Sequence, residues 1–215
     1  MKKKGMIESP KIPTNLQSAN FHDFFYEEDP ELINCLVENS QVENEVIDRL
    51  IISKVIFKNV SFVDSNFGNI DITDVVFDNC NLSNVRFCEG IIHRVEFKNC
   101  KLLGFDLSDA NLGNVLFDNC DLNLSNFAET RLKQVILEQS TLRSANFFNT
   151  KLNKVSFNRC DLNDIDFTQT ILQGIDISTC TFEQINVSLE SLIGCEVSSD
   201  QAIGFSKLLG LKIKE

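Results

Sequence analysis

The chain has 215 residues, and its 31 Asp and Glu against 20 Lys and Arg give a formal net charge of -11 at pH 7. This acidic balance argues against direct, general binding of nucleic acid, because neutralising phosphates requires an excess of Lys and Arg. No apolar run approaches the roughly 18 residues of a membrane span, and none follows Lys2–Lys4 as it would in a signal peptide. A single domain with its own core and no membrane segment is expected.

The first 31 residues do not share the periodicity of the rest of the chain. All three prolines lie here, and a basic start precedes an acidic cluster. We expect residues 1–31 to form an N-terminal extension that caps the adjacent end of the following domain through a short helix. A partly ordered tail is the alternative. The apolar residues expected in the helix are Leu16, Phe21, Phe24, Phe25 and Tyr26.

Residues 32–198 follow a five-residue repeat, which becomes strict from Val55. An apolar residue stands at every fifth position from Phe57 to Val197, and none of these positions is polar. Five residues turn an α-helix by roughly 140° beyond a full turn and flip a strand to its other face, so neither element buries this row. The repeat instead predicts short extended segments joined by corners, each with one large side chain pointing inward.

A second period, of 20 residues, sets the size of each coil. The tetrapeptides that begin at Phe77, Phe97, Phe117 and Phe157 all have the form Phe-x-x-Cys. Four sides of five residues therefore close one coil, and successive coils are expected to stack at about 4.8 Å, the distance between neighbouring strands. The sequence predicts an all-β fold, a right-handed quadrilateral β-helix of about seven coils.

Several positions of the repeat have an interpretation of their own. Asn recurs at corners such as Asn59 and Asn79, because it tolerates a left-handed backbone. Phe105 occupies a slot for a small residue, so we expect a bulge or widened corner there, and Gly90 leaves its slot nearly empty. One inward column is interpreted as reduced, buried thiols of a cytosolic protein rather than zinc ligands, since ligands must converge. Its members are Cys80, Cys100, Cys120, Cys160 and Cys180.

Residues 199–215 change character. Ser198 or Ser199 is expected to cap a helix that Gly210 ends, followed by a short edge strand from Leu211 to Lys214. The helix must cover the open end of the β-helix, and its remaining apolar residues favour a two-fold homodimer joined through the C-terminal ends. The residues expected in the dimer interface are Ala202, Ile203, Phe205, Leu208, Leu209, Leu211 and Ile213.

The register assigns the outward residues to four faces of the coil. Face 1 is centred on Phe57 and its equivalents at 20-residue intervals, face 2 on Phe62, face 3 on Phe67 and face 4 on Ile72. Faces 2 and 3 are mainly acidic. Such a rod either mimics duplex DNA for a partner with a DNA-binding surface or uses its charge only to stay soluble. The acids expected to bind the partner are Glu89, Asp106, Asp109, Glu129, Asp166, Asp121, Asp161 and Asp164.

Faces 4 and 1 differ from these two. Face 4 is basic in its C-terminal half, and face 1 carries an outward apolar row that is either a contact surface or a bed for the N-terminal segment. The outward cations of face 4 are Arg94, Arg131, Lys133, Lys151 and Lys154, against Asp71 and Asp74, and the apolar row of face 1 is Ile56, Val76, Leu116 and Ile136.

No catalytic, cofactor-binding or metal-binding residues are predicted. His22 and His93 have no recognisable partner, and there is no glycine-rich phosphate loop or nucleophile elbow. A β-helix filled by its own Phe and Leu has no pocket of the kind that an enzyme requires. We therefore expect a binding protein without a cofactor rather than an enzyme.

The five-residue pattern resembles that of the pentapeptide repeat family, for example in Ala110–Asn114, Ser125–Phe127 and Ala145–Phe147. Further stretches resemble the quinolone-resistance (Qnr-type) members, and most of all the Gram-positive members of the kind known from Enterococcus. These stretches are Ile92–Cys100, Leu172–Val187 and Gln201–Leu211. The resemblance implies a cytoplasmic dimer that binds DNA gyrase or topoisomerase IV and protects it from fluoroquinolones through a DNA-like shape and charge.

One departure from that family pattern limits what can be carried over. Many Gram-negative Qnr-type proteins have two loops that interrupt the repeats and carry much of the protection, whereas this register never breaks. The fold, the dimer and the class of partner are carried over, but no loop residue is. The competing hypothesis is a scaffold that holds an unrelated partner on face 4 or on the apolar row of face 1, with the acidic faces serving solubility alone.

Overall fold

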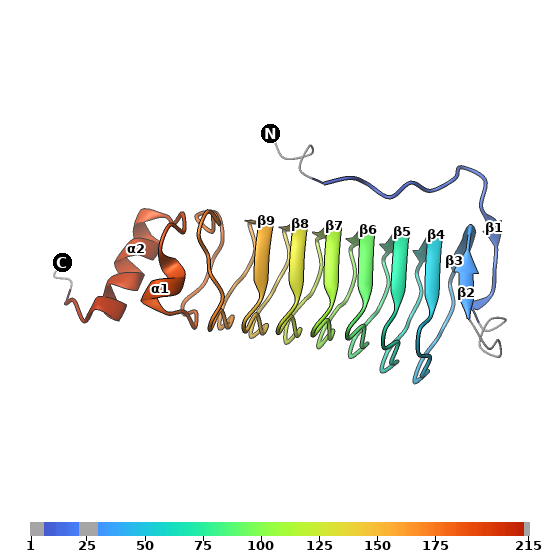
Figure 1. Cartoon of the computed structure of the whole chain (residues 1–215), viewed down its shortest axis with the longest axis horizontal. Coiled ribbons are helices and arrows are strands. Elements are labelled where there is room, and N and C mark those ends of the chain that lie inside the picture. Colours follow the sequence, from blue (N-terminus) through green and yellow to red (C-terminus); the bar gives the residue numbers. More distant parts are fainter. Residues whose placement is uncertain (1–6, 22–29, 213–215) are drawn as a thin grey trace.

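The computed structural model describes residues 7–21 and 30–212, which form a straight rod of stacked coils (Figure 1). Strands β4 to β9 recur at 20-residue intervals and pair in parallel in that order. Two shorter strands, β2 and β3, pair with β4, and β1 pairs with β3 at the N-terminal end. The strands are β1 Gln17–Ser18, β2 Glu31–Ile33, β3 Cys35–Glu38, β4 Ile51–Lys58, β5 Asp71–Asp78, β6 Ile91–Lys98, β7 Asn111–Asp118, β8 Arg131–Glu138 and β9 Lys151–Asn158.

The pairing register confirms the 20-residue coil. Val55 pairs with Val75, and Val75 pairs with Val95, so each residue lies beside its equivalent in the next coil. Single parallel bridges continue the same register on the other two faces, as between Asn66 and Arg86. The strands therefore occupy faces 4 and 1, and the predicted parallel β-helix fold is confirmed.

Each coil turns its corners through left-handed residues. Every fifth residue from Asn34 to Gly174 has a positive φ, including Asn59 at 54° and Asn79 at 55°. Residues other than Gly and Asn rarely adopt this conformation, yet Lys54 and Leu124 adopt it here. Because the main-chain hydrogen bonds to neighbouring coils fix every corner alike, the fold imposes the conformation on whichever residue falls there.

The core consists of aromatic and aliphatic columns that stack from coil to coil. The rings of Phe77 and Phe97 are 4.9 Å apart and 4° from parallel, and Phe97 and Phe117 repeat this geometry. The small inward slots often hold hydroxyl or thiol groups, which donate to carbonyls of the preceding coil. Cys100 Sγ lies 3.4 Å from the Phe77 oxygen, and Thr130 Oγ1 lies 2.8 Å from the Leu107 oxygen. These donors occupy carbonyls that would otherwise face an apolar interior.

The expected bulge at Phe105 is wrong. Phe105 is fully buried and its ring lies 5.0 Å from that of Phe87, while the bridges on either side keep the register. The empty slot expected at Gly90 is also filled, because a Cβ there would lie 2.9 Å from the side chain of Ile70. A large side chain in one coil therefore fills the space left by a small residue in a neighbouring coil, and the backbone path does not change.

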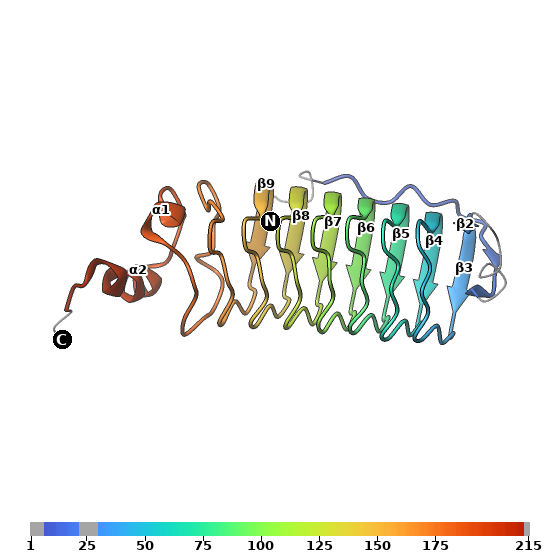
Figure 2. The same ribbon diagram turned by 60° about the horizontal axis from the view of Figure 1, so that its bottom comes forward.

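The described residues 7–20 are not helical, so the helix expected around Leu16 is absent there, whereas Phe21 lies in a 3-10 turn. Phe21 is buried, with its ring 5.5 Å from Phe62 and 6.1 Å from Phe57. Leu16 precedes strand β1 and is half-buried. Residues 7–20, called the N-terminal strap here, return along the side of the rod (Figures 1 and 2). Phe24, Phe25 and Tyr26 of the predicted helix lie outside the described residues.

The C-terminal end carries helices α1 Leu189–Leu192 and α2 Ser199–Phe205 and the 3-10 helix η2 Ser206–Leu209. As predicted, Ser198 caps α2, in a capping box with Gln201. The Gln201 amide also donates to the carbonyls of Ile177 at 3.0 Å and Cys180 at 2.9 Å, which fastens α2 to the last coil.

Two features of this end differ from the sequence-based expectation. Helix α1 was not predicted, because Leu192 keeps the five-residue spacing of the repeat. In the structure a helical turn replaces the extended segment expected there. The predicted edge strand is absent at Leu211 and Lys212, and Ile213 and Lys214 lie outside the described residues.

A buried hydroxyl tests how completely the core satisfies its polar groups. Ser125 Oγ is buried without a hydrogen-bond partner in the described part of the chain, whereas Ser140 Oγ donates to the Glu138 carbonyl at 2.8 Å and accepts from the Cys120 N–H at 3.0 Å. We expect Ser125→Ala to leave the free energy of unfolding unchanged or raise it by up to about 1 kcal/mol, and Ser140→Ala to lower it by about 1–2 kcal/mol. Denaturant titration of both variants measures the difference, and equal losses would contradict the assignment.

Candidate functional site

Two depressions on the described part of the chain are open to solvent. A shallow, open depression of about 530 Å³ lies between faces 2 and 3, and Asn84, Arg86 and Asp106 line it with other polar residues. No group of three or more His, Cys, Asp or Glu could hold a metal ion in residues 7–21 and 30–212. None of the helices in these ranges has the length and hydropathy needed to span a bilayer. The outer faces are therefore the surfaces to consider.

The inward column of cysteine thiols is structural and unreactive. All eight cysteines are free, and the five of the predicted inward column are buried. The neighbouring Cys120 thiol and burial together raise the pKa of the Cys100 thiol to about 12. The thiol is therefore protonated at neutral pH, and the column is part of the core rather than a nucleophile or a ligand set.

Three of the predicted acids form a row along the corner between faces 3 and 4. Glu89, Asp109 and Glu129, called the acidic ladder here, are exposed and share a left-handed φ of 58°. Each main-chain N–H bonds to the next coil, as from Glu89 to the Ser108 oxygen at 2.9 Å, so successive carboxylates stand about one coil, or roughly 4.8 Å, apart at the backbone. No ion pair or side-chain hydrogen bond in the described part of the chain occupies these three carboxylates.

Four other predicted acids hold the turns of faces 2 and 3. In each, Oδ1 accepts the main-chain N–H two residues later, which is the Asx-turn arrangement. Asp106 and Asp166 also accept the side-chain amides of Asn126 and Asn186, both at 3.0 Å. The turn bonds join Asp106 to Ser108 (3.1 Å), Asp121 to Asn123 (3.2 Å), Asp161 to Asn163 (3.1 Å) and Asp166 to Thr168 (2.8 Å).

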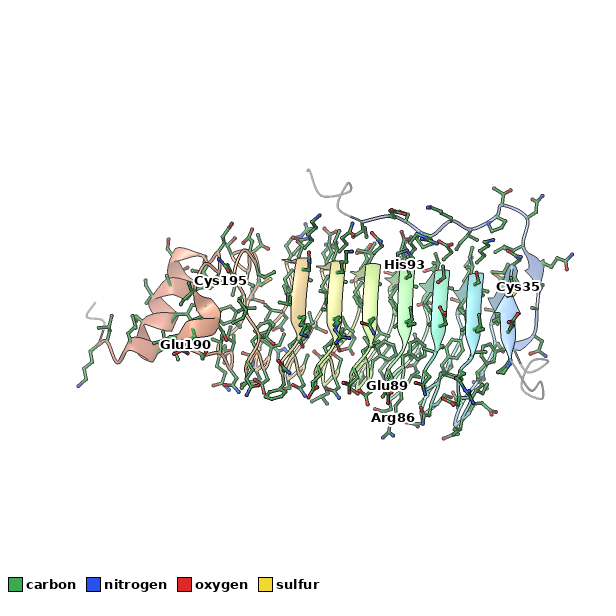
Figure 3. The ribbon with its side chains drawn as sticks, viewed as in Figure 1. Cys35, Arg86, Glu89, His93, Glu190 and Cys195 are labelled. Carbon is green, nitrogen blue, oxygen red and sulfur yellow. The ribbon has the colours of Figure 1, made fainter. Side chains whose placement is uncertain are left out.

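Two of the predicted acids also have other partners. Arg143 Nε lies 2.6 Å from Asp161 Oδ2. Asp164 is exposed but accepts from Asn163 Nδ2 at 2.7 Å and from the Gln184 amide. The structure therefore narrows the predicted eight acids to the three of the acidic ladder as the carboxylates free to meet a partner. In Figure 3, Glu89 lies with Arg86 along one edge of the rod, whereas His93 lies at the opposite edge, beside the N-terminal strap.

The expectation that Arg94 and Asp74 are outward surface charges is wrong. Arg94 Nε lies 2.5 Å from Asp74 Oδ1 and Arg94 Nη2 lies 2.8 Å from Oδ2, and Asp74 is only 4% exposed. The Arg94 guanidinium holds the pKa of Asp74 below its usual range, against the effect of burial. This bidentate pair is part of the structure and not of an open basic face.

The N-terminal strap covers this ion pair. The main-chain N–H of Lys11 donates to Asp74 Oδ1, and that of Glu8 donates to Asn114 Oδ1, each at 2.9 Å. Three extended residues rise about 10 Å, which matches two coils of about 4.8 Å, so the strap runs along the rod in step with its side chains. Asn114 and Asp74 were missed as docking residues, because the repeat gives no sign of which corner another segment will cover.

Apolar side chains gather at the C-terminal end of the rod. Of the predicted dimer residues, Ala202, Ile203, Leu208, Leu209 and Leu211 are exposed, and Phe205 is half-buried against Phe182 with the rings 5.7 Å apart. Ile213 lies outside the described residues. Two exposed residues of the same end were not predicted, namely Leu189 and Ile193, which is 69% exposed. Both occupy outward positions of the five-residue register, but the sequence-based interface began only at Ala202.

Two family models match the chain. One, described as a pentapeptide repeat region, matches residues 90–167, and the other, described as pentapeptide repeats in eight copies, matches residues 56–92 and 65–104. Together they span more than half of the chain. The chain belongs to the pentapeptide repeat family. In this pentapeptide repeat protein, left-handed corners and a 20-residue register form the coil.

Solved structures of other pentapeptide repeat proteins are also similar. A trypsin-treated form of QnrB1, a plasmid-mediated fluoroquinolone resistance protein, is 19% identical over 86% of this chain and 99% of its own, with a TM-score of 0.49. HetL of the cyanobacterium Nostoc sp. strain PCC 7120, a protein involved in heterocyst differentiation regulation, is 13% identical over 78% of this chain and 87% of its own, with a TM-score of 0.44.

A third similar structure is a pentapeptide repeat protein from the thylakoid lumen of Arabidopsis thaliana, which is 20% identical over 62% of this chain and 72% of its own, with a TM-score of 0.40. No curated protein matches the chain. These matches do not identify the Enterococcus-like subgroup expected from the sequence.

The buried ion pair predicts a pH dependence. Because the pKa of Asp74 is lowered in the folded state, the pair stabilises fully above the unfolded pKa of about 4 and loses its effect as pH falls through the lower folded value. Asp74→Asn should therefore lower the free energy of unfolding by about 1–3 kcal/mol at pH 7, and the difference from the parent should shrink below about pH 4. Denaturant titrations across this range test it, with the exposed Asp71→Asn as control; a difference that stays constant down to the acid end would contradict it.

Proposed function

We propose that the protein is a non-enzymatic mimic of DNA that binds a type II topoisomerase, DNA gyrase or topoisomerase IV, and protects it from fluoroquinolones. The acidic ladder is the observation that carries the proposal. Glu89, Asp109 and Glu129 form a regularly spaced row of free carboxylates at the corner turns between faces 3 and 4. The resemblance of the sequence to Qnr-type proteins supports the choice of partner.

The charge density of the ladder sets how closely it imitates a duplex. Double-stranded DNA carries one charge per about 1.7 Å of its axis, whereas the ladder has one per coil of roughly 4.8 Å. Three charges at this density give a partial imitation of the duplex. We expect binding that weakens with added salt, as it does for a DNA-binding surface that exchanges its counterions.

A homodimer joined at the C-terminal ends is part of the proposal. The exposed apolar residues at that end, among them Ile203, Leu209 and Ile193, form a cluster suited to a self-complementary two-fold contact. Two rods joined end to end carry two such rows, one on each protomer. The proposal also places the protein in the cytoplasm, where a topoisomerase acts on DNA.

The second candidate function is a scaffold for an unrelated protein, in which the acidic ladder serves solubility alone. The exposed cations of face 4 favour it, because they present a second surface of opposite charge on the same rod. The two functions differ in what the acidic ladder contributes, so reversal of its charge separates them.

Charge reversal of the acidic ladder tests the proposed function. The triple variant Glu89→Lys, Asp109→Lys and Glu129→Lys should lose all effect on gyrase supercoiling in the presence of ciprofloxacin, whereas the parent dimer in excess should restore it. The fold should survive, since Lys54 and Lys154 already adopt the same left-handed corner conformation.

The matched control reverses three exposed acids elsewhere, with Glu31→Lys, Glu38→Lys and Asp71→Lys. This control changes the net charge by the same amount and should keep the effect on gyrase. A parent protein without any effect on gyrase or topoisomerase IV would overturn the proposal. If both triple variants lost the effect on gyrase equally, net charge and not the acidic ladder would be responsible.

The dimer has a separate test. Ile203→Asp with Leu209→Asp should convert the protein from dimer to monomer, because the interface would then bury carboxylates that have no partners. Light scattering after size exclusion gives the mass directly. Ile91→Asp, at a residue 54% exposed on face 4, is the control and should leave the mass unchanged. A monomeric parent would contradict this part of the proposal.

A further inference from the structure

Face 4 carries a group of cations just beyond the strap. Arg131, Lys133, Lys151 and Lys154, called the cationic patch here, are all exposed on strands β8 and β9. The strap bonds to Asp74 and Asn114, one coil or more before the patch, so its described part leaves these four side chains open.

The patch is not balanced by carboxylates of its own face. From residue 110 to residue 174 face 4 contains no Asp or Glu, and Glu129 stands at the adjoining corner, two residues before Arg131. Arg131 pairs in register with Lys151, which places two like charges on neighbouring strands, an arrangement that destabilises a sheet. Arg143 and Arg159, in the same coils, each have a carboxylate partner. The repulsion within the patch would be relieved by a bound anion.

The strap shows what kind of chain lies along this side of the rod. It is an extended peptide whose Glu8 carboxylate lies 3.3 Å from Lys11 Nζ of the strap itself, and it adds, after the larger effect of Asp74, to the raised pKa of Arg94. Its main chain follows the coils in step, as the bonds from Glu8 and Lys11 show. The corner between faces 4 and 1 therefore already holds an extended segment, and the cationic patch lies farther along the rod, on and beside this corner.

We propose that the cationic patch binds an extended acidic peptide segment of a partner protein. The patch spans about two coils and one face, which suits two or three carboxylates of such a segment. A duplex or a long single strand needs a larger basic footprint, and the net charge of -11 opposes it. The inference does not depend on the proposed function, because the cationic patch and the acidic ladder are different surfaces.

The test measures binding of defined probes by fluorescence anisotropy at low salt. The probes are a labelled peptide of about 12 residues that alternates Glu and Ser, the same peptide with Gln in place of Glu, and a single-stranded oligothymidine of similar length. The Glu peptide should bind, and added salt should weaken it, since the contacts are between exposed charges. The Gln peptide should not bind.

Two double variants distinguish binding by the cationic patch from a general effect of net charge. Arg131→Gln with Lys151→Gln should weaken binding of the Glu peptide by at least about tenfold, because it removes the stacked pair of cations. Lys58→Gln with Lys101→Gln removes two exposed cations from faces 1 and 2 and should change affinity less than about twofold. Equal losses in the two would overturn the inference.

A third variant distinguishes a binding role from a structural one. Lys151→Glu turns the like-charged pair into an opposite pair across β8 and β9, so it should keep or raise the melting temperature while abolishing binding. A loss of binding that accompanies unfolding would contradict the inference. So would tighter binding of the oligothymidine than of the Glu peptide, since it would assign the patch to nucleic acid.

Discussion

The structure depends on one constraint, the in-register parallel stacking of 20-residue coils. Each main-chain hydrogen bond between coils places a residue beside its equivalent, so one choice of register fixes every inward column and every outward row. The left-handed corners are part of the same constraint. Lys54, Glu89 and Leu124 adopt a conformation that their side chains do not favour, because the bonds above and below leave no other path.

Stacking also decides how charge is distributed. A residue type repeated at 20-residue intervals becomes a straight row, whether the stacked rings of Phe77, Phe97 and Phe117 inside or the carboxylates of the acidic ladder outside. The same geometry forces Arg131 against Lys151 and gives Asp74 its partner Arg94 one coil away. A solenoid of this kind therefore builds its binding surfaces from single columns, and one substitution alters a column at one height only.

The two ends of the rod do not follow the five-residue repeat, and different elements cover them. At the N-terminal end Phe21 packs onto the rings of the first coils, and the strap uses main-chain donors to run back along the rod. At the C-terminal end Gln201 binds two carbonyls of the last coil and leaves apolar side chains of α2 and η2 exposed. In the described part of the chain, Phe21 covers rings of the first coils, whereas several large apolar side chains at the C-terminal end stay exposed.

The sequence by itself determined the fold, the inward columns, the corners and the helix capped by Ser198, because each follows from spacing that the backbone must obey. Only the tertiary structure decided which acids are free, since the Asx turns of Asp106 and Asp121 and the pair between Asp74 and Arg94 depend on side-chain directions and neighbouring coils. It also decided the path of the strap and the position of α1. Segments without the repeat take their places from the surface on which they lie, and no spacing in their own sequence encodes that surface.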